Sequence, residues 1–151
     1  MHSNDDLAAL AVELIAAGSH FTRAAYQASG MELSNVSMRV LAALEREPGL
    51  RIGELAAREG IRQPSMSQAM KRLVDDGYVA RRTADDDARA TALTITDAGR
   101  EVLRNYRTAA AEAVAPVFEP LTPKDVATLK RAAELLPELT GELKQREGGR
   151  E

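Results

Sequence analysis

The sequence predicts a mainly α-helical fold with one small β-hairpin, and two observations support this. Aromatic residues make up only 3% of the 151 residues, so Leu, Val, Ile, Met and Ala must fill the interior, which favours close helix packing over an aromatic-rich β-sandwich. Apolar residues recur with helical spacing along most of the chain, and the pattern changes to that of strands only between residues 78 and 95. The length suits one domain, or a small domain within a longer helical frame.

A long first helix is expected over residues 4–29. Ser3 or Asn4 can cap it, two aspartates in the first turn suit the positive end of the helix dipole, and Gly30 ends it. Its apolar stripe consists of Leu7, Leu10, Leu14, Ala17 and Phe21.

Three shorter helices are expected next. Ser34 caps the first, which stops before Pro48. Residues 53–59 form the second, which ends at Gly60, a residue that can adopt the left-handed conformation of a tight turn. The third runs from residue 63 or 64 to Asp76 and is terminated by a glycine. Their inward-facing residues are Met38, Leu41 and Leu44, then Met66, Met70 and Leu73.

Two strands and two helices complete the expected chain. Residues 78–83 and 91–95 predict a β-hairpin around a polar loop. Thr96 caps a long helix from residue 97 to about 117, which Pro116 should kink or end. Thr122 begins a last helix that Pro137 should bend.

The segment from Leu55 to Ile95 is the most informative for function. Two helices joined by a short turn form a helix-turn-helix when a small residue stands where they cross, a glycine stands in the turn and an apolar residue stands early in the second helix. Ala56, Gly60 and Met66 fill these three positions, and Ile61 supplies an apolar plug under the turn. The hairpin that follows directly strengthens this interpretation.

The second helix of this motif predicts a DNA-binding face. If its methionines and Leu73 face the core, the helical period places polar and basic residues on the opposite side, where they could bond base edges or phosphates. A solvated polar face is the alternative, which we would favour for an isolated helix. Arg81 and Arg82 follow on the hairpin and favour the DNA interpretation. The predicted residues of this face are Ser65, Ser67, Gln68, Lys71 and Arg72.

The hairpin loop allows two interpretations. It could be a charged surface hairpin without a role, and its three aspartates would repel phosphate. Alternatively, Asp87 fixes the hairpin and orients Arg89, which then enters a narrow, electronegative minor groove.

Several motifs together resemble the MarR family of bacterial winged-helix transcription regulators. They are Gly53-Glu54-Leu55-Ala56, Gln63-Pro64-Ser65-Met66-Ser67, Arg72-Leu73-Val74-Asp75-Asp76-Gly77-Tyr78-Val79, Arg81-Arg82, Asp87-Ala88-Arg89 and Ile95-Thr96-Asp97-Ala98-Gly99. The resemblance implies a winged helix-turn-helix lobe flanked by dimerisation helices, and a homodimer on a palindromic operator. It implies major-groove or phosphate contacts by Arg62, Gln63, Pro64, Ser65, Ser67, Gln68, Lys71 and Arg72, and wing contacts by Arg81, Arg82, Asp87 and Arg89.

The chain departs from the family pattern at two places. Arg62 stands where the family often has a Ser or Asp cap, so it could contact phosphate instead. Ala90 follows Arg89 where a second basic residue is frequent, and Asp85 and Asp86 make the wing tip more acidic. These changes weaken the expected wing contact.

We expect one domain over residues 1–151, with dimerisation helices at 1–30 and 97–145, a DNA-binding lobe at 34–96 and a disordered tail at 146–151. The flanking helices carry more apolar surface than a lobe of this size needs. Folding back onto the lobe of the same monomer is the alternative, but paired half-sites require two linked recognition helices. The expected interface residues are Leu7, Leu10, Leu14, Val117, Leu129, Leu136 and Leu143.

The resemblance also implies an effector, a small phenolic or carboxylated molecule that releases a repressor from its operator. Candidate ligand contacts are His20, Met38, Arg39 and Tyr106. Alternatives are an activator without a ligand switch and a winged-helix protein-interaction module.

Composition excludes several other classes. The chain has no cysteine and two histidines, which excludes thiol chemistry and leaves little for a metal site. We expect no cofactor and no catalysis, because no nucleophile elbow or phosphate-binding glycine loop occurs. No signal or membrane segment is recognisable, so a cytoplasmic location is expected. The net charge of −3 is uneven: residues 61–83 hold an excess of +3, and the rest carries −6.

Overall fold

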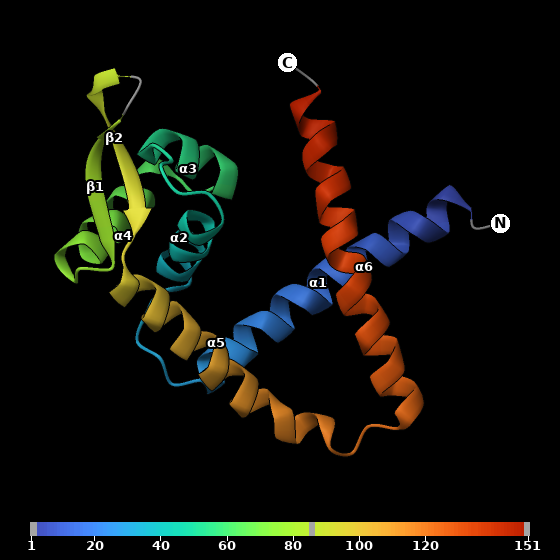
Figure 1. Ribbon diagram of the computed structural model, residues 1–151. Coiled ribbons are helices and arrows are strands. Elements are labelled where there is room, and N and C mark those ends of the chain that lie inside the picture. The colour runs from blue at the N-terminus through green and yellow to red at the C-terminus, as the bar shows by residue number, and fades with distance from the viewer. Residues whose placement is uncertain (1–2, 85–86, 150–151) are drawn as a thin grey trace. The chain divides into compact units, whose positions relative to one another are not determined.

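The structure, a computed structural model, describes residues 3–84 and 87–149. At residues 84, 87–90, 147 and 148 it describes the backbone but not the side chains. It confirms the mainly helical fold with one antiparallel hairpin (Figure 1). Contacts group the chain into two compact units, one ending at Ala113 and the other beginning at Val114. The elements are α1 (Asn4–Ala28), α2 (Asn35–Arg46), α3 (Ile52–Glu59), α4 (Gln63–Asp75), β1 (Val79–Ala84), β2 (Asp87–Ile95), α5 (Asp97–Phe118) and α6 (Pro123–Gly148).

The helix boundaries follow the predicted caps. The hydroxyl of Ser3 accepts a hydrogen bond from the amide of Asp6, and the hydroxyl of Ser34 accepts one from the amide of Ser37. Gly60 ends α3 with φ +58°, in the left-handed region where a side chain is strained. The starts of α1 and α2 and the sharp end of α3 are therefore encoded locally.

The core lies in the lobe formed by α2, α3, α4, the hairpin and the first part of α5. The predicted inward-facing residues of α2 and α4 are all buried. Leu50 joins this core and pairs with the hairpin, because its carbonyl accepts from the amide of Leu93 and the amide of Gly49 donates to the Leu93 carbonyl. The largest fully buried side chains are Leu41, Leu44, Leu55, Met66, Met70, Leu73, Val40 and Ser37.

The second strand is longer than predicted. Residues 87–90 were expected in the loop, but β2 begins at Asp87 and pairs Thr91 with Thr83 and Asp87 with Ala84, with an irregularity between Thr83 and Ala84. Strand pairing at the tip of a hairpin depends on backbone hydrogen bonds. The lack of alternating apolar side chains at residues 87–90 therefore does not prevent this segment from pairing with β1. The first strand begins at Val79 because the amide of Tyr78 still bonds back to the carbonyl of Leu73.

A compact junction joins the hairpin to α5. The hydroxyl of Thr96 donates to the carbonyl of Gly77 and accepts from the amide of Gly99, at 2.7 and 3.1 Å. A Cβ atom at Gly99 would lie 2.2 Å from the carbonyl oxygen of Tyr78, far inside contact distance. The end of α4, the hairpin and α5 can meet here because residue 99 has no side chain.

The flanking helices differ from the lobe in burial. Among the described residues, α1 and α6 contain no buried side chain. Helix α5 ends at Phe118, shortly after Pro116, whereas α6 is continuous through Pro137 and extends past residue 145 to Gly148. In the described part of the chain, no helix combines the length and apolar character needed to cross a bilayer.

Candidate nucleic-acid interface

Helices α3 and α4 form the predicted helix-turn-helix. Ala56 is buried at the crossing and Met66 is fully buried on the second helix. The amides of Gly60 and Ile61 both bond back to the carbonyl of Ala56, which closes the turn. Ile61 is half-buried against the core, as expected of the apolar plug. These contacts fix the direction in which α4 leaves the turn.

Helix α4 presents its polar side to solvent. Its three predicted inner residues are fully buried, so the remaining face is directed outward by the helical period. Pro64 lies in the first turn, where its missing amide proton costs nothing. Arg62 precedes the helix and gives no side-chain cap, which agrees with its departure from the family pattern. The predicted contact residues Arg62, Gln63, Pro64, Ser65, Ser67, Gln68, Lys71 and Arg72 are all exposed.

Two basic residues of this face are ion-paired. Lys71 Nζ donates to Asp75 Oδ2 at 2.9 Å, and Arg72 Nε lies 3.8 Å from Asp76 Oδ2. The hydrogen bond and charge of Asp75 raise the pKa of Lys71. The sequence contained the signal for these pairs, namely opposite charges four residues apart on one helix.

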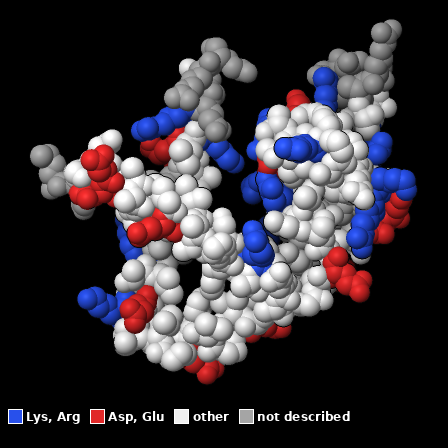
Figure 2. All heavy atoms as spheres, turned by 180° about the vertical axis from the view of Figure 1, so that it is seen from behind, with Lys and Arg blue, Asp and Glu red and all other residues white. Residues whose placement is uncertain are grey.

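The hairpin carries further basic residues beside this helix. Arg81 and Arg82 lie on β1 and are exposed, at the positions that pair with Leu93 and Ala92. The predicted wing residues Asp87 and Arg89 lie on β2, and their side chains are outside the described residues. Figure 2 shows blue basic side chains on the lobe that carries the wing, with red acidic side chains directly beside them.

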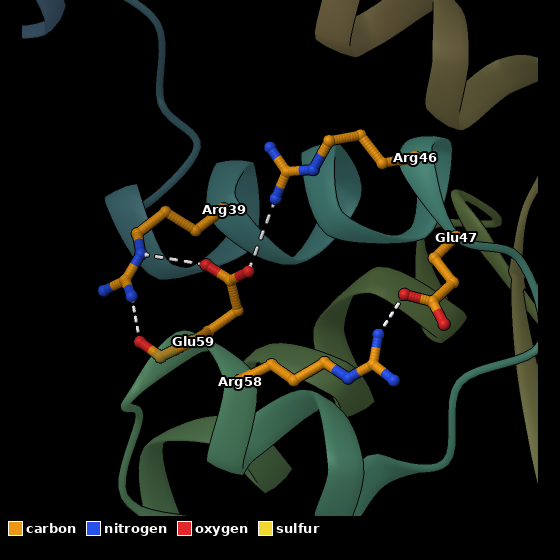
Figure 3. A network of polar contacts seen from close by, with 5 residues as sticks. All are labelled: Arg39, Arg46, Glu47, Arg58 and Glu59. Atoms are coloured by element: carbon orange, nitrogen blue, oxygen red, sulfur yellow. Dashed lines mark hydrogen bonds and ion pairs between the residues drawn. The ribbon is translucent and has the colours of Figure 1, made fainter. Parts of the chain in front are cut away.

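A group of polar contacts between α2 and α3 was not predicted (Figure 3). Glu59, the last residue of α3, lies 3.5 Å from the guanidinium nitrogens of both Arg39 and Arg46 on α2. Arg39 also donates to the carbonyl of Glu59, and Arg58 donates to Glu47 at the end of α2. The seven-residue spacing of the two α2 arginines places them on one helix face, and this spacing was a usable signal.

We expect Glu59→Gln to lower the free energy of unfolding by about 1 kcal/mol, because two arginines lose a half-buried carboxylate partner. Thermal unfolding followed by circular dichroism measures this change. Glu134→Gln is the matched control, since Glu134 pairs with Arg131 at 3.0 Å and both are mostly exposed. Equal, negligible losses in both variants would show that Glu59 does not hold α2 against α3.

The four candidate ligand residues differ in burial. Met38 and Tyr106 are buried in the same core, and the Tyr106 ring packs against that of Tyr26, with centroids 4.6 Å apart. Burial, followed by the nearby Tyr26, raises the pKa of Tyr106. Arg39 is engaged by Glu59, and His20 is exposed on α1. Two of the four candidates are therefore buried and two are exposed.

The exposed large apolar side chains follow a clear distribution in the described residues. They all lie on α1, on the last residues of α5 or on α6, and none lies on the lobe. The predicted interface residues belong to this group: Leu7 is 50% exposed, Leu10 57%, Leu14 41%, Val117 64%, Leu129 47%, Leu136 43% and Leu143 64%.

Comparison with known proteins yields consistent similarities. The MarR family model matches residues 29–90. An uncharacterized HTH-type transcriptional regulator of Mycobacterium bovis is 32% identical over 114 residues, which are 76% of this chain and 78% of that protein. A MarR-family transcriptional regulator from Silicibacter pomeroyi has a similar structure, with a TM-score of 0.57, 28% identity and coverage of 89% of this chain and 90% of that chain.

A further structural similarity extends to the flanking helices. The apo form of MarR from Escherichia coli gives a TM-score of 0.71 at 18% identity, covering 84% of this chain and 96% of that chain. At this identity the likeness concerns the fold alone. The structural similarity covers more of the chain than residues 29–90, which the family model matches. The helix-turn-helix and the hairpin therefore lie within a larger fold that the two structures share.

Proposed function

The chain belongs to the MarR family of DNA-binding transcriptional regulators, and on this premise we propose that it is a homodimeric repressor of a palindromic operator. The family consists of regulators rather than enzymes. In our proposal α4 enters the major groove, the wing reaches the adjacent minor groove, and the flanking helices join two chains. A small phenolic or carboxylated molecule then releases the dimer from DNA.

The observation that carries this proposal is the two-sided character of α4. Its apolar side is fully buried, whereas its polar side is exposed in the position of a recognition helix and lies on the lobe that also carries Arg81 and Arg82. Residues early in a recognition helix reach base edges, and Ser or Gln side chains there can read them. A surface helix of any function exposes a polar face, so DNA binding is favoured by the position of this face on the second helix of the helix-turn-helix, next to a basic hairpin.

The dimer is supported by the exposed apolar residues of α1 and α6. Helices with apolar stripes bury them against a partner, and each of these two helices exposes several large apolar side chains. Two recognition helices linked in one dimer would meet half-sites about one helical turn, ~34–36 Å, apart. The candidate ligand contacts stay His20, Met38, Arg39 and Tyr106, of which Met38 and Tyr106 lie in the buried core of the lobe.

Selection of bound fragments from randomised and genomic DNA, with and without phenolic and carboxylated compounds, tests the proposal. We expect a palindromic consensus and loss of binding with an active compound. A consensus without any ligand effect would favour the activator without a ligand switch. Absence of any preferred DNA would favour the protein-interaction module and contradict the proposed function.

Arg72→Ala and Arg89→Ala should each weaken operator binding by about tenfold, because a phosphate or base contact by arginine contributes ~1–3 kcal/mol. Fluorescence anisotropy with the selected duplex measures the dissociation constants. Arg131→Ala is the matched control, because Arg131 is an exposed, ion-paired arginine on α6. If both variants bind like the parent, the proposed docking of the lobe is wrong.

A further inference from the structure

The end of α4 places two acidic residues directly beside two basic residues of the proposed DNA-binding face. Lys71 and Asp75 are joined at 2.9 Å, and Arg72 and Asp76 approach to 3.8 Å. Side chains four residues apart share a helix face, so each acid lies next to one cation. All four side chains are at least 43% exposed, and exposed pairs of this kind add little to stability.

The two acids are poorly placed for stabilising the helix. Carboxylates near a helix C-terminus lie at the negative end of the helix dipole, where cations are favoured instead. An ion pair on a helix is also weaker when the acid follows the base by four residues than when the acid precedes it. The main electrostatic effect of Asp75 and Asp76 is therefore to offset the positive charges of Lys71 and Arg72. The raised pKa of Lys71 is one sign of this effect.

Carboxylate and DNA phosphate compete for the same cations. Residues 63–76 hold two basic and two acidic side chains, so the proposed recognition helix has no net charge. The fields of opposite charges this close together nearly cancel at a distance. Salt screens what remains beyond the Debye length, which is about 8 Å at physiological salt. Recognition helices direct their N-terminal residues at base edges, and this leaves Lys71 and Arg72, in the C-terminal half, to contact the phosphate backbone.

We propose that Asp75 and Asp76 act as internal counterions that weaken the binding of DNA phosphate by Lys71 and Arg72. The inference rests on the proposed function, since it requires α4 to bind DNA. Phosphates are common to all sequences, so the weakening is uniform and lowers the affinity for operator and for unrelated DNA by the same factor. Sequence preference then depends on the uncharged side chains Ser65, Ser67 and Gln68, which the acids do not engage.

The test compares the full-length parent with Asp75→Asn and Asp76→Asn on two labelled duplexes of about 30 base pairs, long enough for both half-sites. One carries the selected operator and the other a shuffled sequence. Each cation freed onto a phosphate should steepen the slope of log K against log salt by about 0.9, so the two copies of a variant in the proposed dimer should steepen it by about 1.8, a gain of up to about 60-fold at ~0.1 M salt. We expect this gain on both duplexes, with unchanged or slightly raised thermal stability.

Two controls make the result specific. Adding Lys71→Gln to Asp75→Asn should abolish the gain, because the freed cation is then missing. Glu134→Gln removes one negative charge from a pair on α6 and should leave both affinities unchanged. If the parent binds DNA and the Asp variants bind it equally well, or if Glu134→Gln gives the same gain, the counterion role is wrong while the proposed function stands. If the parent binds neither duplex, the proposed function itself fails.

Discussion

Leu136→Glu is expected to convert the dimer into monomers whose lobe remains folded. Leu136 is 43% exposed in the single chain, so the lobe does not depend on it, but the proposed interface would have to bury the new carboxylate. An unpaired charge buried at an interface costs about 3 kcal/mol or more, which corresponds to at least about a 100-fold weaker dimer. Sedimentation equilibrium over a concentration series measures this change, and operator binding should fall with it.

The companion variant Leu14→Glu should behave in the same way, because Leu14 belongs to the same group of exposed residues on α1. Gln145→Glu is the matched control: it adds one carboxylate to an exposed polar position of α6 and should leave the dimer intact. Circular dichroism should give the same helix content in all three variants. An unchanged dimer in both leucine variants would contradict the role assigned to α1 and α6.

Gly99→Ala should destabilise the lobe by about 3 kcal/mol or more, at or above the upper end of what overpacking costs. The added Cβ would lie 2.2 Å from the Tyr78 carbonyl oxygen and 2.8 Å from a side-chain carbon of Ile95. The backbone oxygen cannot swing aside as a flexible side chain would, so the hairpin and α5 must separate. For a chain of this size we expect a fall in Tm of roughly 6–12 °C in a thermal melt.

Gly53→Ala is the control for this prediction, because a Cβ at Gly53 meets nothing within 4 Å and the residue lies in α3. Alanine is favoured over glycine in a helix by up to about 1 kcal/mol, so this variant should melt at the same or a slightly higher temperature. Equal melting temperatures for the two variants would show that the junction tolerates a side chain at residue 99.

Local patterns were sufficient to predict most of the fold. Ser3, Ser34 and Gly60 act through contacts with neighbouring residues, so their effect on helix ends is visible in sequence. The division of α4 into a buried and an exposed face follows from its period alone, and burial of Met66 and exposure of Gln68 confirm it. The exposed polar face of the candidate site was thus predictable residue by residue.

Features that depend on contacts between distant residues were not predicted. Glu59 meets Arg39 and Arg46 only because α3 packs against α2, twenty and thirteen residues away along the chain. The early start of β2 at Asp87 depends on backbone pairing with β1, to which its polar side chains give no clue. Tyr106 meets Tyr26 across 80 residues, a contact that the local sequence around either ring does not indicate.

The most direct test of the central proposal is a salt titration of binding to the selected operator and to a duplex with one half-site scrambled. About three phosphate contacts from each lobe, by residues such as Arg62 and Arg81, predict a slope of log K against log salt near −5 for the operator. The single half-site should give about half that slope and much weaker binding. Equal affinities for the two duplexes, or binding that does not change with salt, would contradict a dimer that reads a palindrome through two winged lobes.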